Sequence, residues 1–299
     1  DKVIGDHTFN ILAGVNRETI RNDNFSAFRR FFISNDIDYM FAGGDAEKDN
    51  GGAAWERARL NYFGRANYNY KGKYIAELLW RVDGSYMFPK DTHYVFFPGA
   101  MLGWVVSEED FWKDNVPFVN YFKIRASYGQ MGNDNVYYNG ALQEYQYFST
   151  YGFGSYIIND DMVKSLRESR VPNSFITWEV ANNYNLGFDF QFMDGKFNAE
   201  IDLFKNSRES ILWQRNASIP QSTGMTLPAE NIGKVDNSGF DVSLGYREAF
   251  GELGFNVAVN AGYAKNKIIF WDEAPGAPEW QKSTGRAINA GLYYNYDGI

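Results

Sequence analysis

The 299-residue chain contains no cysteine and only two histidines, His7 and His93. The absence of cysteine excludes disulfide scaffolds, thiolate metal sites and thiol catalysis. Two histidines leave no histidine-based metal cluster or catalytic triad available. No G-x-G-x-x-G motif joins a predicted strand to a helix. We therefore predict that the chain is not an enzyme and that it holds no cofactor and no metal.

Basic residues are outnumbered by acidic ones, 29 to 37, which gives a net charge of -8 and a pI near 5.0. A nucleic-acid-binding protein usually carries a basic surface, and this chain has no sustained run of basic residues. We therefore expect no nucleic-acid partner.

Long apolar runs are also missing, since none approaches the roughly 18 residues that a membrane-spanning helix needs. The opening "DKVIGDHTFNILAG" has neither the basic start nor the long apolar stretch of a signal peptide. A chain of this kind can cross a membrane only with strands. We would then expect it to be a piece of a longer barrel protein.

Aromatic residues are abundant instead, at 18% of the chain, with 21 Tyr and 25 Phe. A buried Tyr hydroxyl needs a hydrogen-bond partner, so this excess is hard to place in a soluble core. Amphipathic rings fit readily at the boundary between lipid and water, where membrane barrels carry aromatic girdles. The composition therefore favours a membrane boundary.

The stretch "LNYFGRANYNYKGKYIAELLWRVDG" (60–84) alternates between apolar and polar residues with a period of two. Because successive residues of a strand point to opposite faces, the pattern predicts two strands around a turn at 71–73. One face of this hairpin is apolar and the other is polar. The apolar face carries Leu60, Tyr62, Tyr68, Tyr70, Tyr74, Ala76, Leu78, Trp80 and Val82.

The same alternation recurs at 9–15, 122–128, 184–192, 197–203, 240–246 and 255–263. Asp194-Gly195, between two of these segments, is a strong hairpin signal. The pattern predicts about nine or ten strands of roughly ten residues each. The predicted fold class is all-β, a transmembrane antiparallel β-barrel segment.

The predicted connections alternate between short and long. Short ones are expected at 71–73, about 107–119, 194–195 and 248–252, and long ones at about 18–57, 84–96, 131–180, 207–236 and 265–290. Short periplasmic turns and long extracellular loops are typical of outer-membrane barrels. A soluble lipocalin-like barrel is the alternative, but its repeated apolar outer face would aggregate in water.

Eight charged residues are predicted by alternation to share the polar, lumen-facing side of the strands. They are Arg65, Glu77, Arg81, Asp83, Arg125, Asp189, Glu200 and Asp202. Such residues can simply hydrate and pair within a barrel wall. They can also line a substrate passage or hold an internal plug, because lumen side chains tune selectivity.

Aromatic residues in the expected extracellular loops form a second candidate set. They are Tyr145, Tyr147, Phe148, Tyr151 and Trp213. Their rings can stack on sugar rings or pack the loops together, and the sequence favours neither.

Two further clusters have structural readings. Ser107 precedes three consecutive acids at 108–110, which predicts a helical turn capped by this serine in a short connection. The "GNDN" cluster at 132–135 is predicted to be a plain loop, because no loop supplies a spaced set of calcium ligands with a closing Glu.

Several long stretches resemble the SusC/RagA family of TonB-dependent outer-membrane transporters. They are "YFGRANYNYKGKYIAELLWRVDGSYMF", "FPGAMLGWVVSEEDFWK" with "FKIRASYGQMGND", "WEVANNYNLGFDFQFMDGKFNAEIDLF", "AENIGKVDNSGFDVSL" and the closing "LYYNYDGI". They occur in the family's order and run through most of residues 7–299.

The resemblance implies that residues 1–299 are a partial barrel domain without the plug, from a barrel of about 22 strands in the outer membrane of a Gram-negative bacterium. It implies active import of glycans or oligopeptides, with a SusD-like surface lipoprotein as a lid and with TonB acting through a missing N-terminal region. The bilayer is the remaining expected partner. A passive porin, or a structural or adhesin barrel, is the alternative function.

Overall fold

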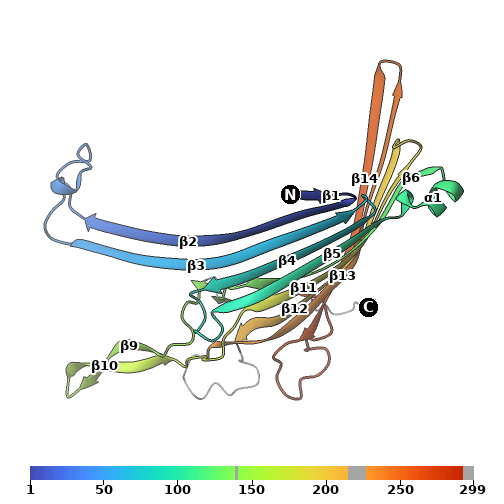
Figure 1. Cartoon of the computed structure of the whole chain (residues 1–299). Coiled ribbons are helices and arrows are strands. Elements are labelled where there is room, and N and C mark those ends of the chain that lie inside the picture. Colours follow the sequence, from blue (N-terminus) through green and yellow to red (C-terminus); the bar gives the residue numbers. More distant parts are fainter. Residues whose placement is uncertain (139–140, 215–226, 292–299) are drawn as a thin grey trace, which may run out of the picture. The chain divides into compact units, whose positions relative to one another are not determined.

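The computed structural model describes residues 1–138, 141–214 and 227–291, and its regular secondary structure is almost all β-strand (Figure 1). The strands in chain order are β1 (Lys2–Ile4), β2 (His7–Arg29), β3 (Lys48–Tyr70), β4 (Tyr74–Ser85), β5 (Tyr94–Val105), β6 (Val119–Asn133), β7 (Tyr137–Tyr138), β8 (Ala141–Leu142), β9 (Thr150–Ile158), β10 (Asp161–Arg170), β11 (Glu179–Phe192), β12 (Phe197–Gln214), β13 (Ala229–Phe250) and β14 (Leu253–Phe270). Three short helices are η1 (Met40–Ala42), η2 (Val106–Glu108) and α1 (Asp110–Asn115). In the described residues no helix has the length and apolar character needed to cross a membrane.

Ten strands form one sheet in the order β1-β2-β3-β4-β5-β6-β11-β12-β13-β14. Every pairing from β4 to β14 is antiparallel. The predicted all-β antiparallel fold is therefore confirmed. Within the described residues the sheet stays open, because β1 and β14 do not pair with each other.

The chain divides into two compact units, Asp1–Val15 with Asn61–Ile299, and Asn16–Leu60. The smaller unit contains parts of β2 and β3 and the connection between them. In it, the Arg29 guanidinium donates to the Gly43 carbonyl at 3.0 Å, and Arg30 pairs with Glu47 at 2.8 Å. These contacts close the loop at the strand ends.

The expected long connection at 18–57 is wrong, because β2 runs to Arg29 and β3 begins at Lys48. The expected loop at 207–236 is likewise too long, since β12 reaches Gln214 and β13 begins at Ala229. Strands of roughly ten residues were therefore an underestimate, as β2 and β3 have 23 residues each. Backbone pairing needs no apolar side chains, so these strands continue where the alternation ends.

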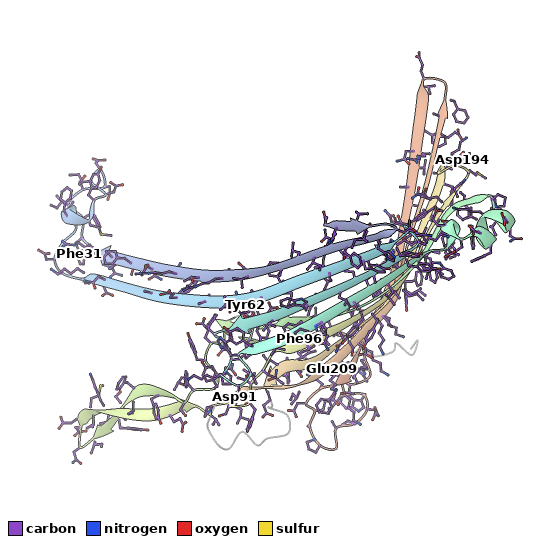
Figure 2. All side chains as sticks on the ribbon, in the orientation of Figure 1. Phe31, Tyr62, Asp91, Phe96, Asp194 and Glu209 are labelled. Carbon is purple, nitrogen blue, oxygen red and sulfur yellow. The ribbon has the colours of Figure 1, made fainter. Side chains whose placement is uncertain are left out.

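The predicted tight turns are confirmed by their backbone. Lys71 and Gly72 have φ of 54° and 72°, and Asp194 and Gly195 have 54° and 77°. Consecutive left-handed residues are what a tight hairpin needs, and glycine adopts that conformation without strain. Figure 2 shows Asp194 at one end of the strands, and Asp91 and Glu209 toward the other, where the long connections lie.

The short connection between β5 and β6 contains η2 and α1, as the predicted helical turn requires. Its predicted cap is wrong. Glu109, not Ser107, precedes α1, and no side chain caps the helix. The Ser107 hydroxyl is buried and has no hydrogen-bond partner among the described residues.

The buried core lies among the long connections rather than beneath the sheet. We call it the loop core, and it consists of Met87, Phe88, Phe97, Val136, Ile176 and Trp178. Ile176 is fully buried, and Trp178 packs against Phe88 and Phe97 with ring centroids 5.2 and 5.7 Å apart. Segments distant in sequence are thereby packed together at this end of the sheet.

Candidate functional site

Register carries the apolar and polar alternation across seven neighbouring strands. One row of paired residues is Ala76, Leu102, Ala126, Leu186, Leu203, Phe240 and Tyr263, from β4 to β14. The adjacent row of the same face is Tyr74, Trp104, Ile124, Phe188, Ile201, Val242 and Ala261. We call this the apolar face. The apolar face depends on the register of each strand pair, because a slip of one residue would move every side chain of a strand to the other face.

The opposite, polar face has a row of paired residues at Gly103, Arg125, Gly187, Asp202, Asp241 and Gly262. Small residues thus stand beside the charged ones. A wall built this way leaves room for long side chains to lie flat on it.

Arg125 is the centre of the strongest charge cluster on the polar face. Its Nε donates to Asp189 at 3.0 Å, and its Nη1 and Nη2 donate to the two oxygens of Asp202 at 2.8 and 2.9 Å. All three side chains are about three-quarters buried. The bidentate geometry fixes the guanidinium in place more firmly than a single ion pair would.

Gly187 makes this cluster possible. A Cβ at Gly187 would lie 2.5 Å from Cζ of Arg125, so the guanidinium occupies the space that any other residue would fill. Gly187 pairs with Arg125 on one side and with Asp202 on the other. The glycine therefore lets Arg125 reach across β11 to β12.

The other predicted charges form smaller groups. Arg65 lies 3.6 Å from Glu77, and Arg81 lies 2.9 Å from Asp83. Glu200 pairs in register with Asp189 and Ser243. Their exposure to a lumen stays a prediction.

A groove of about 620 Å³ on the polar face includes Asp189, Glu200, Arg247 and Tyr121 in its lining. Asp189 and Glu200, two acids of the predicted lumen-facing set, are therefore accessible from the polar face of the sheet. Charged groups in such a groove are suited to contacts with a polar surface.

Three of the predicted loop aromatics form one cluster. Tyr147 and Phe148 have ring centroids 4.3 Å apart, and Tyr145 lies 6.2 and 6.3 Å from them. Tyr86 joins the cluster edge-on to Tyr145 at 5.8 Å, and its hydroxyl donates to Glu144 at 2.7 Å. The rings therefore pack the loops together while Phe148 remains 56% exposed.

The other two predicted aromatics lie elsewhere. Tyr151 belongs to β9, in a separate two-stranded sheet with β10 inside the long connection, and it is exposed. Trp213 is in β12 rather than in a loop, and its ring packs against that of Trp271 in a tilted arrangement, with centroids 4.1 Å apart. The five aromatics thus form no single surface.

Buried hydrogen bonds tie the loop core together, and sequence patterns gave no sign of them. Ser85 donates to the buried Asp134 at 2.6 Å, and the Trp178 indole donates to the Thr92 carbonyl at 3.2 Å. Asp134 belongs to the "GNDN" cluster, so this residue anchors a loop. The described residues contain no group of three or more His, Cys, Asp or Glu side chains positioned to hold a metal ion.

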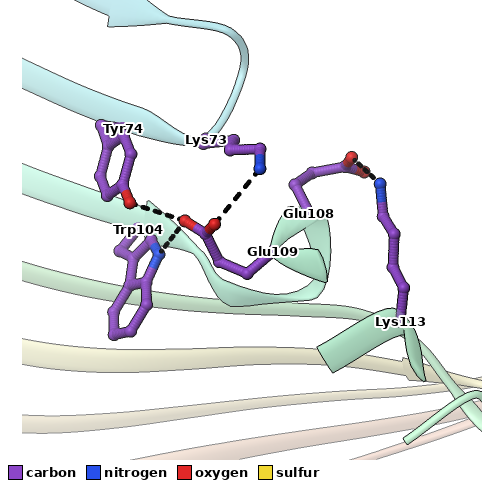
Figure 3. A network of polar contacts seen from close by, with 6 residues as sticks. All are labelled: Lys73, Tyr74, Trp104, Glu108, Glu109 and Lys113. Atoms are coloured by element: carbon purple, nitrogen blue, oxygen red, sulfur yellow. Dashed lines mark hydrogen bonds and ion pairs between the residues drawn. The ribbon is translucent and has the colours of Figure 1, made fainter. Parts of the chain in front are cut away.

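A second polar network, which we call the turn clamp, joins the two neighbouring short connections (Figure 3). Glu109 accepts hydrogen bonds from the Tyr74 hydroxyl at 2.7 Å and the Trp104 indole at 3.2 Å, and it pairs with Lys73 at 3.2 Å. Glu108 instead pairs with Lys113 at 2.8 Å on the surface. Glu109 thereby fixes the helical turn against the β3–β4 turn and the start of the apolar face.

The turn clamp predicts a pH-dependent stability. The hydrogen bond from Tyr74, then that from Trp104 and the charge of Lys73, lower the pKa of Glu109. A lowered pKa means that the stabilisation is present above the pKa of the unfolded chain and is lost as the pH falls through the folded pKa. We expect Glu109→Gln to unfold at lower urea concentration than wild type at pH 7, with the difference shrinking as the pH falls below 4.

Glu108→Gln is the matched control, because the one ion pair of Glu108 within the described part of the chain is the exposed pair with Lys113. Its urea midpoint should stay close to wild type throughout, since exposed pairs contribute little. A Glu109→Gln difference that is unchanged between pH 7 and pH 3 would refute the assigned role of the Glu109 charge.

The continuous apolar face, the polar opposite face and the alternation of short and long connections define the wall of a transmembrane antiparallel β-barrel. Residues 3–298 match the family model described as "TonB dependent receptor-like, beta-barrel". The chain belongs to this family.

Curated relatives agree with this assignment. TonB-dependent receptor P3 of Formosa agariphila is 28% identical over the whole chain, which spans 30% of that protein. TonB-dependent receptor SusC of Bacteroides thetaiotaomicron is 26% identical over 81% of the chain, corresponding to 23% of SusC. The chain therefore spans less than a third of the length of these relatives.

The solved structure of the RagAB peptide importer in its closed-closed state has the same fold. It superimposes with a TM-score of 0.78 at 19% identity, over 96% of this chain and 31% of that chain. The resemblance to the SusC/RagA type predicted from the sequence is thus confirmed.

Proposed function

We propose that this chain is part of the barrel of an active, TonB-dependent importer of glycans or oligopeptides in the outer membrane of a Gram-negative bacterium. The observation that carries the proposal is the match of residues 3–298 to the TonB-dependent receptor barrel. Glycans are proposed because the resemblance to the SusC/RagA family implies them, and peptides also because the structural neighbour is named a peptide importer.

In this proposal the apolar face contacts lipid and the polar face lines the lumen. Rows such as Leu186, Leu203 and Phe240 would meet acyl chains, while Arg125 and its carboxylates would face water and an internal plug. Closed barrels bury both strand edges, so the edges β1 and β14 would pair with further strands of the full transporter.

A SusD-like surface lipoprotein is the proposed lid at the end with the long connections. The loop core packs the connections at that end together, and Tyr145 and Phe148 are exposed there. We assign the contact with TonB to a part of the transporter outside residues 1–299. The chemistry is binding and gated passage, without bond-making by the chain.

The test is uptake by cells that produce the full-length transporter, compared with the same cells lacking TonB. We expect oligosaccharide or oligopeptide uptake that saturates at low concentration and is abolished when TonB is deleted or the proton gradient is collapsed. Uptake that persists unchanged without TonB would overturn active import and favour the passive porin. Purification of the transporter with a surface lipoprotein tests the proposed lid separately.

A further inference from the structure

The segment that follows β14 folds back onto the end of the sheet (Figure 1). The Ile268 N–H donates to the Arg286 carbonyl at 2.8 Å, and the Ile268 carbonyl accepts from Gly285 N–H at 2.8 Å. The Asn266 side chain accepts from Ile288 N–H at 2.6 Å. These bonds hold residues 283–290 over β12, β13 and β14 and enclose a cavity of about 440 Å³.

The cavity has an apolar floor and a cationic rim. Ile211, Val235 and Ile268 form the floor, and Val235 and Ile268 are buried. Arg208, Lys282 and Arg286 are its charged lining residues, and no Asp or Glu of the described chain lines it. In a chain with a net charge of -8, a cavity whose lining charges are all positive is set up for an anion.

The two arginines have donors to spare. The Arg208 side chain makes no ion pair or hydrogen bond with any other described residue, although its backbone pairs with β11 and β13. Arg286 donates through Nη2 to the Glu279 carbonyl at 2.9 Å, which leaves most of its five N–H donors available. Lys282 already pairs with Glu279, so Arg208 and Arg286 are the cations available to a ligand.

The cavity lies on the polar face of the sheet, which is proposed to line the lumen. Arg208 follows Asp202 in β12 at an even spacing, so its side chain projects from the same polar face. The cavity therefore opens on the proposed lumen side, at the end with the long connections. Arg208 is exposed there and can be reached from solution.

The remaining lining favours a sugar over a peptide. Trp271 presents an aromatic ring, and Gln281 and Asn289 supply side-chain amides that can pair with hydroxyl groups. Peptides are commonly captured through an open strand edge, but β12 and β13 are paired on both sides. The N–H and C=O of Ile268 on β14 are already bonded to residues 285 and 286.

We propose that this cavity binds the carboxylate of a uronic acid residue in the imported glycan, with Arg208 and Arg286 as the anion-binding residues. The inference rests on the proposed import function and names the substrate class for it. Planar guanidinium groups match a carboxylate in a bidentate way, and Trp271 in the same cavity lining offers aromatic surface to the sugar ring.

The test is calorimetric titration of trigalacturonate into the full-length transporter in detergent. We expect binding that weakens as salt is raised, and at least about tenfold weaker binding in both Arg208→Gln and Arg286→Gln, the loss of one charge-assisted contact. Lys234→Gln is the matched control. Lys234, on β13, is likewise a cation, but it pairs with Glu209 at 3.5 Å and does not line the cavity. Binding should therefore change less than about twofold.

Arg208→Lys, which keeps the charge, should recover part of the affinity, and heat-modifiable gel mobility shows whether each variant is folded. Galactotriose, the neutral trisaccharide, should bind no better to wild type than to Arg208→Gln. Absence of trigalacturonate binding, or equal weakening by Lys234→Gln, would overturn the proposal. Tighter binding of tetra-aspartate with the same dependence on Arg208 would overturn it in favour of an acidic peptide.

Binding in detergent needs neither TonB nor a proton gradient, so the two proposals can fail separately. Intact trigalacturonate binding together with TonB-independent uptake would refute active import but not the uronic acid site. TonB-dependent uptake without trigalacturonate binding would refute the uronic acid site but not active import.

Discussion

Replacing Ile201 with lysine is expected to destabilise the full-length barrel in lipid vesicles by about 3 kcal/mol. Ile201 is central in the apolar segment of β12, between Ala199 and Leu203, and its register partners are Phe188 and Val242. A lysine there has only acyl chains and apolar side chains around it, and an ammonium group near the middle of a bilayer loses its hydration. Urea unfolding followed by tryptophan fluorescence measures the loss.

Ser127→Lys is the control for this experiment. Ser127 is exposed on the polar face of β6, where its register partners are Met101 and Asn185. A lysine at this position can reach water in the lumen, so the free energy of unfolding should change by less than about 0.5 kcal/mol. Equal losses in the two variants would show that the two faces do not meet different solvents.

Gly187→Val is expected to cost about 2 kcal/mol, because the new side chain would displace the Arg125 guanidinium from both of its carboxylates. The value is set below that of a fully buried pair, since each of the three charged side chains keeps about a quarter of its surface exposed. Asp189 and Asp202 would be left as unpaired like charges on neighbouring strands.

Gly129→Val separates this effect from the general cost of changing a strand glycine. Gly129 is in β6, four residues from Arg125, and a Cβ there would meet no atom within 4 Å. Valine suits a strand, so this variant should be neutral or slightly stabilising in the same unfolding assay. A loss in Gly129→Val as large as in Gly187→Val would remove the Arg125 cluster as the cause.

Alternation was enough to predict the faces of the strands and the tight turns. Leu186 and Leu203, or Arg125 and Asp189, share faces because the side-chain period of a strand is two, and that period is visible in a single sequence. Turn residues such as Lys71-Gly72 and Asp194-Gly195 carry their backbone preference locally. Fold class needed only these local signals and the family resemblance.

Contacts between strands and loops were out of reach, because they depend on register and on space. The alternation predicted that Arg125 and Asp202 share the polar face. Only the pairing of β6, β11 and β12 shows that Gly187 lies between them. The turn clamp was missed for the same reason. A helix-capping pattern at Ser107 is local, whereas Glu109 is stabilised by Tyr74 and Trp104 from other strands.

The long strands were missed for a different reason. Parts of β2 and β3 beyond the apolar alternation are held by backbone hydrogen bonds, which leave no mark in the sequence pattern. The Arg208 cavity could not be predicted either, since it forms only when residues 283–290 fold onto β14.

The most direct test of the account is a spin-label scan of residues 184–190 in β11 of the full-length transporter in lipid vesicles. The label's accessibility to oxygen, which dissolves in lipid, and to a water-soluble nickel complex is measured at each position. We predict high oxygen accessibility at 184, 186, 188 and 190, and high nickel accessibility at 185, 187 and 189. Accessibility without this period of two, or nickel reaching both sets equally, would contradict a barrel wall with lipid on one face and water on the other.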